Sequence, residues 1–223
     1  MTERQGILLD LDGTLTDSVY QHAIAWRKAL ELGGITLSVW RIHRRIGMSG
    51  GLLAESLARE TGRKLSDQQA AKMKQTHARL FKAQMRDVRL LPGAKELMRH
   101  LTKVGVPWAV ATSGGLDSAK PLLNLLDLPT DVPVVSRDDV HHAKPNPDLW
   151  LAAALKLDLP IDQCIAIGDS VWDLLAARRA RALGVGLLAG GYGQEELERA
   201  GAYRVYEDPA DLLLHIDELG IRA

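Results

Sequence analysis

Two aspartates, Asp10 and Asp12, follow a short apolar run near the N-terminus and stand two positions apart. Side chains alternate along an extended chain, so both carboxylates can face the same ligand. Two carboxylates this close repel each other, and a fold tolerates them chiefly where a cation lies between them. Gly13 also permits a simpler interpretation, a strand that ends in an Asp-Gly turn. The partners of these aspartates elsewhere in the chain favour the cation site.

Three later segments carry groups that complement this pair, and each follows an apolar run. Thr112 and Ser113 precede two glycines, so a hydroxyl group and backbone N–H groups can bind a phosphate there. Lys144 lies in a Lys-Pro-Asn-Pro segment, whose prolines restrict the directions that its ammonium group can take. Asp169 ends a further apolar run, and Asp173 follows about one helical turn later. Oxygen ligands of this kind favour Mg²⁺ over zinc, so the pattern indicates a carboxylate cluster, a divalent cation and a phosphate.

Parallel strands must bring these groups together. The apolar runs that predict strands lie at 7–11, 108–111, 132–135, 164–167 and 185–188, with a weaker candidate at 203–206. Helical patterns at 94–104 and 149–157 lie between them, and Asp208-Pro209 predicts the start of a last helix. Strands that alternate with helices predict an α/β fold with a Rossmann-like parallel sheet, whose strand ends meet at one edge.

A long helical segment interrupts this alternation. Roughly ninety residues separate Asp12 from Trp108, several times what one crossover helix needs. Residues 17–87 look helical throughout, and glycines divide them into about four helices. We therefore expect an inserted helical domain at 17–87 and an α/β core made of 1–16 and 88–223. The linkers near 16–18 and 87–91 should lie side by side.

The composition limits the classes of partner. The chain has 223 residues with 28 Lys plus Arg and 28 Asp plus Glu, so no net charge attracts nucleic acid or an anionic membrane. No apolar run is long enough to cross a bilayer, and the first strand begins too early for a signal peptide. The single cysteine, Cys164, lies in an apolar run and is expected to be a buried, inert thiol. We expect a cytoplasmic protein, and a monomer is the simplest expectation.

The order of these motifs resembles that of the haloacid dehalogenase-like hydrolase superfamily. Asp-Leu-Asp-Gly-Thr-Leu-Thr-Asp at 10–17, Ala-Thr-Ser at 111–113, Lys-Pro at 144–145 and Gly-Asp-Ser-x-x-Asp at 168–173 match its four motifs in order. The match spans the whole core. The inserted segment resembles the α-helical cap of the branch that contains phosphoglycolate phosphatase and β-phosphoglucomutase.

The resemblance implies a role for each aspartate. Asp10 would be the nucleophile, and Asp12 would be the general acid and base. Asp10, the backbone carbonyl of Asp12 and Asp169 would bind Mg²⁺. Asp173 would be a supporting carboxylate, near Lys144 or near the waters of the metal ion.

The resemblance also implies a phosphate site and a reaction. Thr112 and the amide of Ser113 would bind the phosphate, and Lys144 would stabilise its charge. The expected function is Mg²⁺-dependent hydrolysis of a small phosphorylated metabolite through an aspartyl-phosphate. Dehalogenases of the superfamily lack the second aspartate, so the presence of Asp12 disfavours dehalogenation.

Two alternatives stay open at this point. A β-phosphoglucomutase-like enzyme would hold a second phosphate, but its anchoring basic residues fall near Gly50 and Gly115 here. A non-catalytic regulator that binds a phosphorylated ligand would be favoured by loss of a catalytic carboxylate, and none is lost.

The segment that selects the substrate is less informative. Arg44 and Arg45 begin a glycine-rich loop that resembles the part of the cap that closes on the site. Arg45 and Ser49 are candidates for substrate contact, although solvated arginines on a helix are as plausible. His22 could reach the site from the linker side, or it could pack in the helical core.

Overall fold

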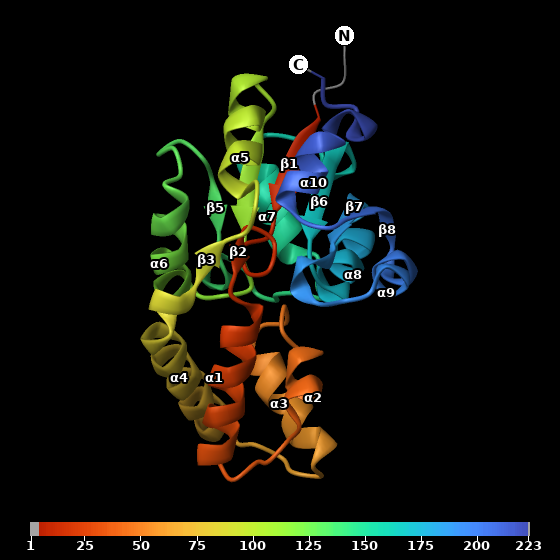
Figure 1. Ribbon diagram of the computed structural model, residues 1–223. Helices are drawn as coiled ribbons and strands as arrows, with labels where there is room; N and C mark the ends of the chain where they lie inside the picture. Colours follow the sequence, from red (N-terminus) through yellow and green to blue (C-terminus); the bar gives the residue numbers. More distant parts are fainter. Residues whose placement is uncertain (1–4, 223) are drawn as a thin grey trace.

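The computed structural model describes residues 5–222, which form an α/β sandwich with a helical layer attached at one end (Figure 1). The sheet has six strands in the order β5-β4-β1-β6-β7-β8, and every neighbouring pair is parallel. Its strands are β1 (Gly6–Leu9), β4 (Trp108–Ala111), β5 (Val134–Val135), β6 (Cys164–Gly168), β7 (Leu183–Leu187) and β8 (Ala202–Tyr206). The predicted parallel sheet is therefore confirmed, and the weak candidate at 203–206 is a strand.

Helices cover both faces of this sheet. They are α5 (Ala94–Lys103), α6 (Leu116–Leu126), α7 (Asp148–Lys156), α8 (Val171–Ala180), α9 (Gln194–Ala200) and α10 (Pro209–Leu214). Single 3₁₀ turns occur at Met85–Asp87, Arg137–Asp139, Ile161–Gln163, Leu188–Gly190 and Ile216–Leu219. Asp208 caps α10 as predicted, since its carboxylate accepts hydrogen bonds from the N–H groups of Ala210 and Asp211. Helix α7 follows Pro147 directly and begins one residue before the predicted pattern at 149–157.

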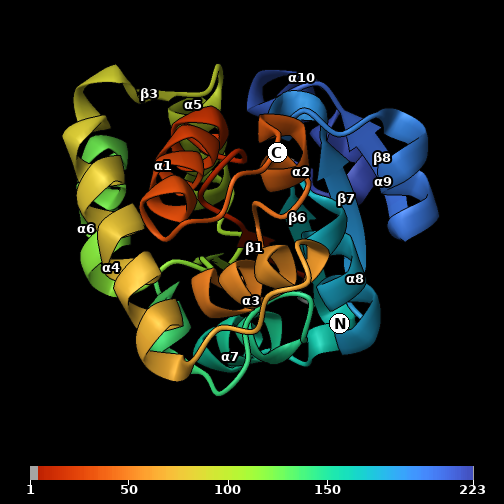
Figure 2. The same ribbon diagram turned by 90° about the horizontal axis from the view of Figure 1, so that it is seen from below.

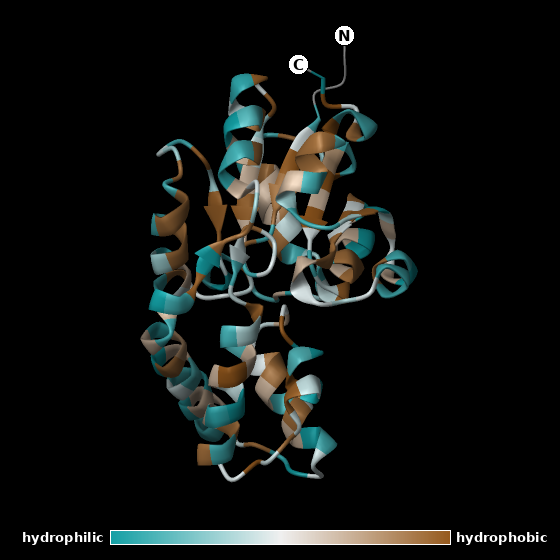
Figure 3. Cartoon of the chain, viewed as in Figure 1, coloured by the Kyte–Doolittle hydropathy of each residue, from teal (hydrophilic) through white to brown (hydrophobic). Residues whose placement is uncertain are grey.

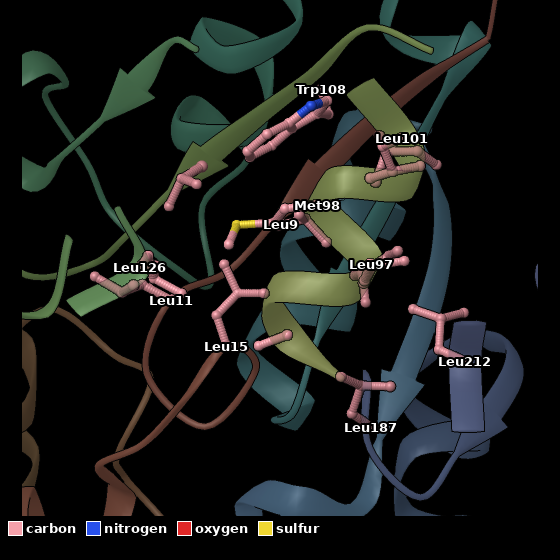
Figure 4. Packing of buried hydrophobic residues seen from close by; sticks show 14 of the residues in the cluster. Leu9, Leu11, Leu15, Leu97, Met98, Leu101, Trp108, Leu126, Leu187 and Leu212 are labelled. Atoms are coloured by element: carbon pink, nitrogen blue, oxygen red, sulfur yellow. The ribbon is translucent and has the colours of Figure 1, made fainter. Parts of the chain in front are cut away.

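Strand β1 shows how the alternation of side chains builds two cores. Ile7 and Leu9 pack on one face with α5, α6 and α10, whereas Leu8 packs on the other face with α7 and α8. Figure 4 shows the first of these cores, where Leu97, Met98 and Leu101 of α5 lie against the sheet. Burial on both faces explains why β1, β4 and β6 read as continuous apolar runs, and brown predominates in the middle of the sheet in Figure 3.

The helical layer consists of α1 (Val19–Leu32), α2 (Val39–His43), α3 (Gly50–Glu60) and α4 (Asp67–Ala83). We call these four helices and their connections the helical insertion. It has its own hydrophobic core, which includes Trp26 and Leu30 of α1 and Leu53 and Leu57 of α3. Figure 2 looks onto this layer from below and shows α1 beside α4, in front of the end of β1.

The two connections between the helical insertion and the sheet run side by side, as expected. They pair as a short antiparallel ribbon of β2 (Thr16–Asp17) and β3 (Arg89–Leu90). Thr16 is opposite Leu90 in this ribbon, and Asp17 is opposite Arg89. The ribbon thus places the helical insertion at the carboxyl end of β1, which is the edge where an open α/β sheet binds ligands.

No helix within residues 5–222 is both long and apolar enough to span a membrane. The expectation that no signal peptide precedes the first strand falls mainly on residues 1–4, which lie outside the described residues.

Candidate active site

Asp10 lies at the centre of the site because β1 is central in the sheet. Its backbone N–H donates to the carbonyl of Ile167 in β6, which continues the strand pairing and fixes the direction of the side chain. The ammonium group of Lys144 contacts Oδ1 of Asp10 and lies 2.6 Å from Oδ1 of Asp173. Lys144 itself is fully buried, and its Nζ also donates to the carbonyl of Ala111 at 3.3 Å. Of the two surroundings expected for Asp173, Lys144 or the waters of a metal ion, the structure shows the contact with Lys144.

The electrostatic state of this cluster follows from burial. Burial raises the pKa of Asp10 to about 8, although Lys144 opposes the shift, and the charge of Asp173 adds to it. Burial also raises the pKa of Asp169 well above its ordinary value, with further contributions from Asp173 and Asp10. The two neighbouring aspartates hold the pKa of Lys144 above its ordinary value despite its burial. One ammonium group therefore stands against three buried carboxylates.

This deficit of positive charge is what a bound divalent cation would correct. Asp10, Asp169 and Asp173 each offer an oxygen, and these oxygens lie within 4.8 Å of one another. Thr14 Oγ1 donates to Oδ1 of Asp169 at 3.2 Å and orients that carboxylate. The donor set is purely oxygen, so the residues fit Mg²⁺ better than a metal ion that prefers sulfur or nitrogen.

Gly13 provides the room for Asp169. It adopts φ +82, and a Cβ atom there would clash with the Asp169 carboxylate. A glycine is needed at this turn for both its left-handed backbone and its lack of a side chain. The Asp-Gly turn that the sequence suggested as the simpler interpretation is thus present, and it belongs to the acidic site.

Asp12 has a different environment from Asp10. Its Oδ1 accepts a hydrogen bond from Ser18 Oγ at 2.6 Å, and it lies 3.0 Å from Nε2 of His22. Burial acts to raise the pKa of Asp12, but His22 and Ser18 outweigh it and hold the pKa below its ordinary value. The two aspartates of the first motif are therefore driven in opposite directions by their surroundings.

Thr112 and Ser113 follow β4 and face the same edge. Thr112 is buried, and its Oγ1 accepts a hydrogen bond from the N–H of Gly114 at 3.0 Å. Ser113 Oγ is buried and has no hydrogen-bond partner among the described residues. An unpartnered buried hydroxyl is costly unless a ligand or water satisfies it, so this loop offers a donor to a bound anion.

A cavity of about 100 Å³ opens between this edge of the sheet and the helical insertion. Its lining from the core consists of Asp10, Asp12, Thr112, Ser113, Gly114, Gly115 and Ser118. Its lining from the helical insertion consists of His22, Trp26, Ile46, Gly47, Met48, Gly50, Leu53, Lys74, His77 and Ala78. The core supplies the polar wall, and the helical insertion supplies a mostly apolar wall with two histidines and one lysine.

The three candidate residues of the helical insertion behave differently. His22 reaches the site, as its contact with Asp12 shows. Arg45 does not line the cavity, because its guanidinium group pairs with Glu60 at 2.5 Å and its Nε donates to Ser56. Ser49 is buried at the start of α3 and does not line the cavity either. In this structure the Arg45 guanidinium group is therefore paired within the helical insertion, and neither Arg45 nor Ser49 is part of the cavity lining.

Sequence reasoning missed Ser18 and His77. Ser18 caps no backbone group of α1 with its side chain and instead binds Asp12. A serine before a helix predicts a cap, so the sequence carries no signal for this contact. His77 lies in α4 and lines the cavity, and only its place on the apolar face of that helix could have marked it as buried.

Known proteins resemble this chain in sequence and in fold. The family model described as haloacid dehalogenase-like hydrolase matches residues 5–181. The crystal structure of a hydrolase from Pseudomonas syringae is 54% identical, covers 97% of this chain and 99% of its own, and superimposes with a TM-score of 0.94. Hexitol phosphatase A of Escherichia coli strain K12 is 30% identical over 178 residues, 79% of each chain.

A third relative comes from another activity of the same branch. Beta-phosphoglucomutase of Bacillus subtilis strain 168 is 28% identical over 218 residues, 95% of this chain and 93% of its own. The family model covers well over half of the chain, and the matched residues include Asp10, Thr112, Lys144 and Asp169. This chain belongs to the haloacid dehalogenase-like hydrolase family.

Proposed function

We propose that this hydrolase is a Mg²⁺-dependent phosphatase that cleaves a small phosphorylated metabolite through an aspartyl-phosphate on Asp10. The observation that carries the proposal is the contrast between the two aspartates of the first motif. Asp10 is buried against Lys144, whereas Asp12 lies at the cavity with Ser18 and His22. Two carboxylates in opposite environments suit two roles, a nucleophile and a proton carrier.

In the first half-reaction, a carboxylate oxygen of Asp10 attacks the phosphorus atom. Lys144 contacts Oδ1, so Oδ2 is the oxygen that would form the bond. The bond between phosphorus and the ester oxygen breaks, and this leaving oxygen takes a proton from Asp12, which must be in its protonated form when the substrate is bound. Thr112 and the amide of Ser113 would hold the phosphate oxygens during the transfer.

In the second half-reaction, Asp12 accepts a proton from a water molecule. The resulting hydroxide attacks phosphorus, which releases inorganic phosphate and restores the Asp10 carboxylate. Mg²⁺, held by Asp10, Asp169 and the backbone carbonyl of Asp12, would offset the negative charge that gathers on the phosphoryl group. Asp173 would keep Lys144 directed at Asp10.

The cavity limits the size of the leaving group. Its volume of about 100 Å³ lies below the range of about 300–1,000 Å³ that holds drug-sized ligands. A leaving group of a few carbon atoms fits this space better than a nucleoside. We propose that residues 17–87 act as a cap whose apolar wall covers such a group and excludes water.

A sugar-phosphate mutase is the alternative within the family. Gly50 and Gly115 both line the cavity, so the positions that would grip a second phosphate supply no charge. Lys74 is the only lysine or arginine among the described residues of the lining. A mutase would convert a hexose 1-phosphate to its isomer without net phosphate release, which separates the two activities.

Phosphate release from a panel of phosphomonoesters, with Mg²⁺ and with chelator, tests the proposal. We expect turnover of at least one small substrate that stops when the metal ion is removed. Asp10→Asn should abolish this turnover, because an amide is not a nucleophile for phosphorus. Turnover by Asp10→Asn would disprove the assignment of the nucleophile, and turnover that ignores the chelator would disprove the metal dependence. Binding of a phosphorylated ligand without any turnover would favour the regulator.

A further inference from the structure

Two histidines from different helices form a chain of hydrogen bonds that ends at Asp12. His22 of α1 lies with its Nε2 atom 3.0 Å from Oδ1 of Asp12 and its Nδ1 atom 3.0 Å from Nε2 of His77. His77 comes from α4, 55 residues further along the chain. The chain thus connects the acidic edge of the sheet to the far helix of the helical insertion.

The hydrogens of this chain can be assigned from its ends. When Asp12 is ionised it only accepts hydrogen bonds, so Nε2 of His22 carries a hydrogen; when Asp12 is protonated, its own O–H can donate to that nitrogen. The contact between the two imidazoles then needs one hydrogen, on either His22 Nδ1 or His77 Nε2. Burial and the neighbouring His22 hold the pKa of His77 well below its ordinary value, so His77 is neutral and can act as either donor or acceptor. Both contacts can therefore be satisfied at once.

Stacked aromatic rings prevent the two imidazoles from turning. Helix α1 contributes His22 and Trp26, and helix α4 contributes His77 and Phe81, each pair four residues apart. The His22 ring stacks on Phe81 with centroids 3.7 Å apart, and the His77 ring stacks on Trp26 with centroids 4.2 Å apart. Trp26 and Phe81 are 3% and 2% exposed, and Trp26 belongs to the core of the helical insertion whereas Phe81 belongs to the core on the sheet, so neither ring can move aside without disturbing packed neighbours.

We propose that His77 is a positioning residue, which acts through His22 to hold the Asp12 carboxylate where it can pass a proton to and from the reacting oxygen atoms. The inference rests on the proposed role of Asp12. Ser18 holds the same oxygen of Asp12 from the linker side, and His22 holds it from the cavity side. Without His77, the imidazole of His22 keeps its stack on Phe81 but loses the hydrogen bond that holds Nδ1 in place within the plane of the stack.

Three variants separate this role from a structural one. His77→Phe keeps an aromatic ring against Trp26 and removes the nitrogen that faces His22. His77→Gln supplies an amide that can again donate to or accept from His22 Nδ1. His215→Phe is the control, since His215 also stacks on a ring, and its Nδ1 donates a hydrogen bond to the carbonyl of Asp211, at the end of α10 and outside the cavity lining.

The dependence of the rate on the leaving group distinguishes the two roles, because a loss of folding would lower the rates with all substrates equally. An alkyl phosphate needs its leaving oxygen protonated, whereas 4-nitrophenyl phosphate releases a stable anion that needs little help. With an alkyl substrate, His77→Phe should lower kcat about 10- to 100-fold and change KM less than about twofold. With 4-nitrophenyl phosphate, kcat/KM should fall less than about threefold. His77→Gln should recover most of the alkyl activity, and His215→Phe should match the wild type.

Several results would overturn the inference while the proposed function stands. One is an equal loss of kcat/KM with the alkyl phosphate and with 4-nitrophenyl phosphate. Another is a rise in KM with kcat unchanged, which would mark His77 as a substrate contact. The third is a His77→Gln variant whose activity on the alkyl phosphate stays as low as that of His77→Phe. If the wild type releases phosphate from no substrate, the proposed function fails. The contact between His77 and His22 can then be tested by NMR, through the imidazole ¹⁵N resonances of His22 in the wild type and in the variants. His22 resonances that move in His77→Phe and return in His77→Gln support the positioning contact, and unchanged His22 resonances refute it.

Discussion

At the scale of single residues, the site is governed by an imbalance of buried charge. Three carboxylates lie within 4.8 Å of one another, and the Lys144 ammonium group is paired with two of them. Asp169 has no ion pair with a described residue, and its Oδ1 accepts a hydrogen bond from the hydroxyl of Thr14. A buried carboxylate of this kind lowers the stability of the fold at neutral pH unless a cation accompanies it.

A substitution of Asp169 tests this imbalance. In chelator, Asp169→Asn should raise Tm by a few degrees, because it removes a buried charge and keeps an oxygen for Thr14. Mg²⁺ at about 100 times its dissociation constant should raise the Tm of the wild type by about 5 °C or more, and the variant should lose this response. Thermal unfolding with and without Mg²⁺ measures both effects. The exposed Asp131→Asn is the control, and an unchanged Mg²⁺ response in Asp169→Asn would contradict the prediction.

Cys164 offers a second test at this scale. The residue is buried in β6 and donates through Sγ to the carbonyl of Pro160 at 3.4 Å, as expected of an inert thiol. Burial, with a contribution from Asp162, raises its pKa to about 11. At pH 8 only about one molecule in a thousand then carries the reactive thiolate. Alkylation followed by mass spectrometry should be at least about 100-fold slower in the native protein than in denaturant. Comparable rates would show that the thiol is accessible.

At the scale of elements, the helical insertion depends on its own core to hold α1 against α4. Leu30 of α1 is fully buried in this core, whereas Leu32 of the same helix is 63% exposed. Replacing each of these two leucines by alanine changes helix propensity in the same way, so a difference between the two variants in the free energy of unfolding reports packing.

Truncation of these leucines should therefore have unequal effects. Leu30→Ala should lower the free energy of unfolding by about 2–5 kcal/mol, because it removes apolar contacts and leaves a cavity. Leu32→Ala should change it by less than about 0.5 kcal/mol. Chemical denaturation gives both values. A loss in Leu32→Ala as large as that in Leu30→Ala would show that this face of α1 is covered by something else.

At the scale of the whole molecule, one loop of the helical insertion is seated on the core. Trp172 Nε1 and the hydroxyl of Tyr192 both donate to the backbone carbonyl of Arg44, at 3.2 Å and 3.0 Å. His43 Nε2 lies 2.8 Å from the carbonyl of Gly190. Gly47 passes so close to the fourth motif that a Cβ atom there would lie 2.6 Å from Ser170 Oγ, and its φ is +94. These contacts hold the apolar wall over the acidic edge.

A side chain at Gly47 should weaken this closure. Gly47→Ala should raise KM several-fold and change kcat less, because the loop must withdraw from Ser170 while the acidic edge stays intact. Gly62→Ala is the control for backbone strain, since Gly62 also has a positive φ but has no atom within 4 Å of its Cβ position. Gly51→Ala is the control for an open position with ordinary backbone. Steady-state kinetics on a substrate identified with the panel of phosphomonoesters would show the effect. Equal KM values in all three variants would contradict it.

The oligomeric state belongs to the same scale. A monomer remains our prediction for the full chain, and light scattering coupled to size exclusion measures it directly. A mass near 24.4 kDa supports it, and a multiple of that mass contradicts it.

The sequence by itself determined the sheet and the acidic edge. Asp10, Thr112 and Asp169 each follow an apolar run, and parallel strands bring such positions to one edge regardless of how the rest packs. The order of the motifs and the spacing of the helices were sufficient to predict the sheet and its acidic edge, because both can be read from residues that are close together in the sequence. The position of the helical insertion followed from the length of the segment that interrupts the alternation.

Only the tertiary structure decided what meets this edge from the helical insertion. The contacts of His22 with His77 and of Arg45 with Glu60 depend on how two helices pack, and the periodicity of a helix shows which face is buried but not what lies against it. Ser18 had the sequence of a helix cap and became a partner of Asp12, because the β2–β3 ribbon turns it toward that carboxylate. Side chains far apart in the sequence meet only when the helices pack. Which side chains meet is set by contacts throughout the core and not by any short segment of the sequence.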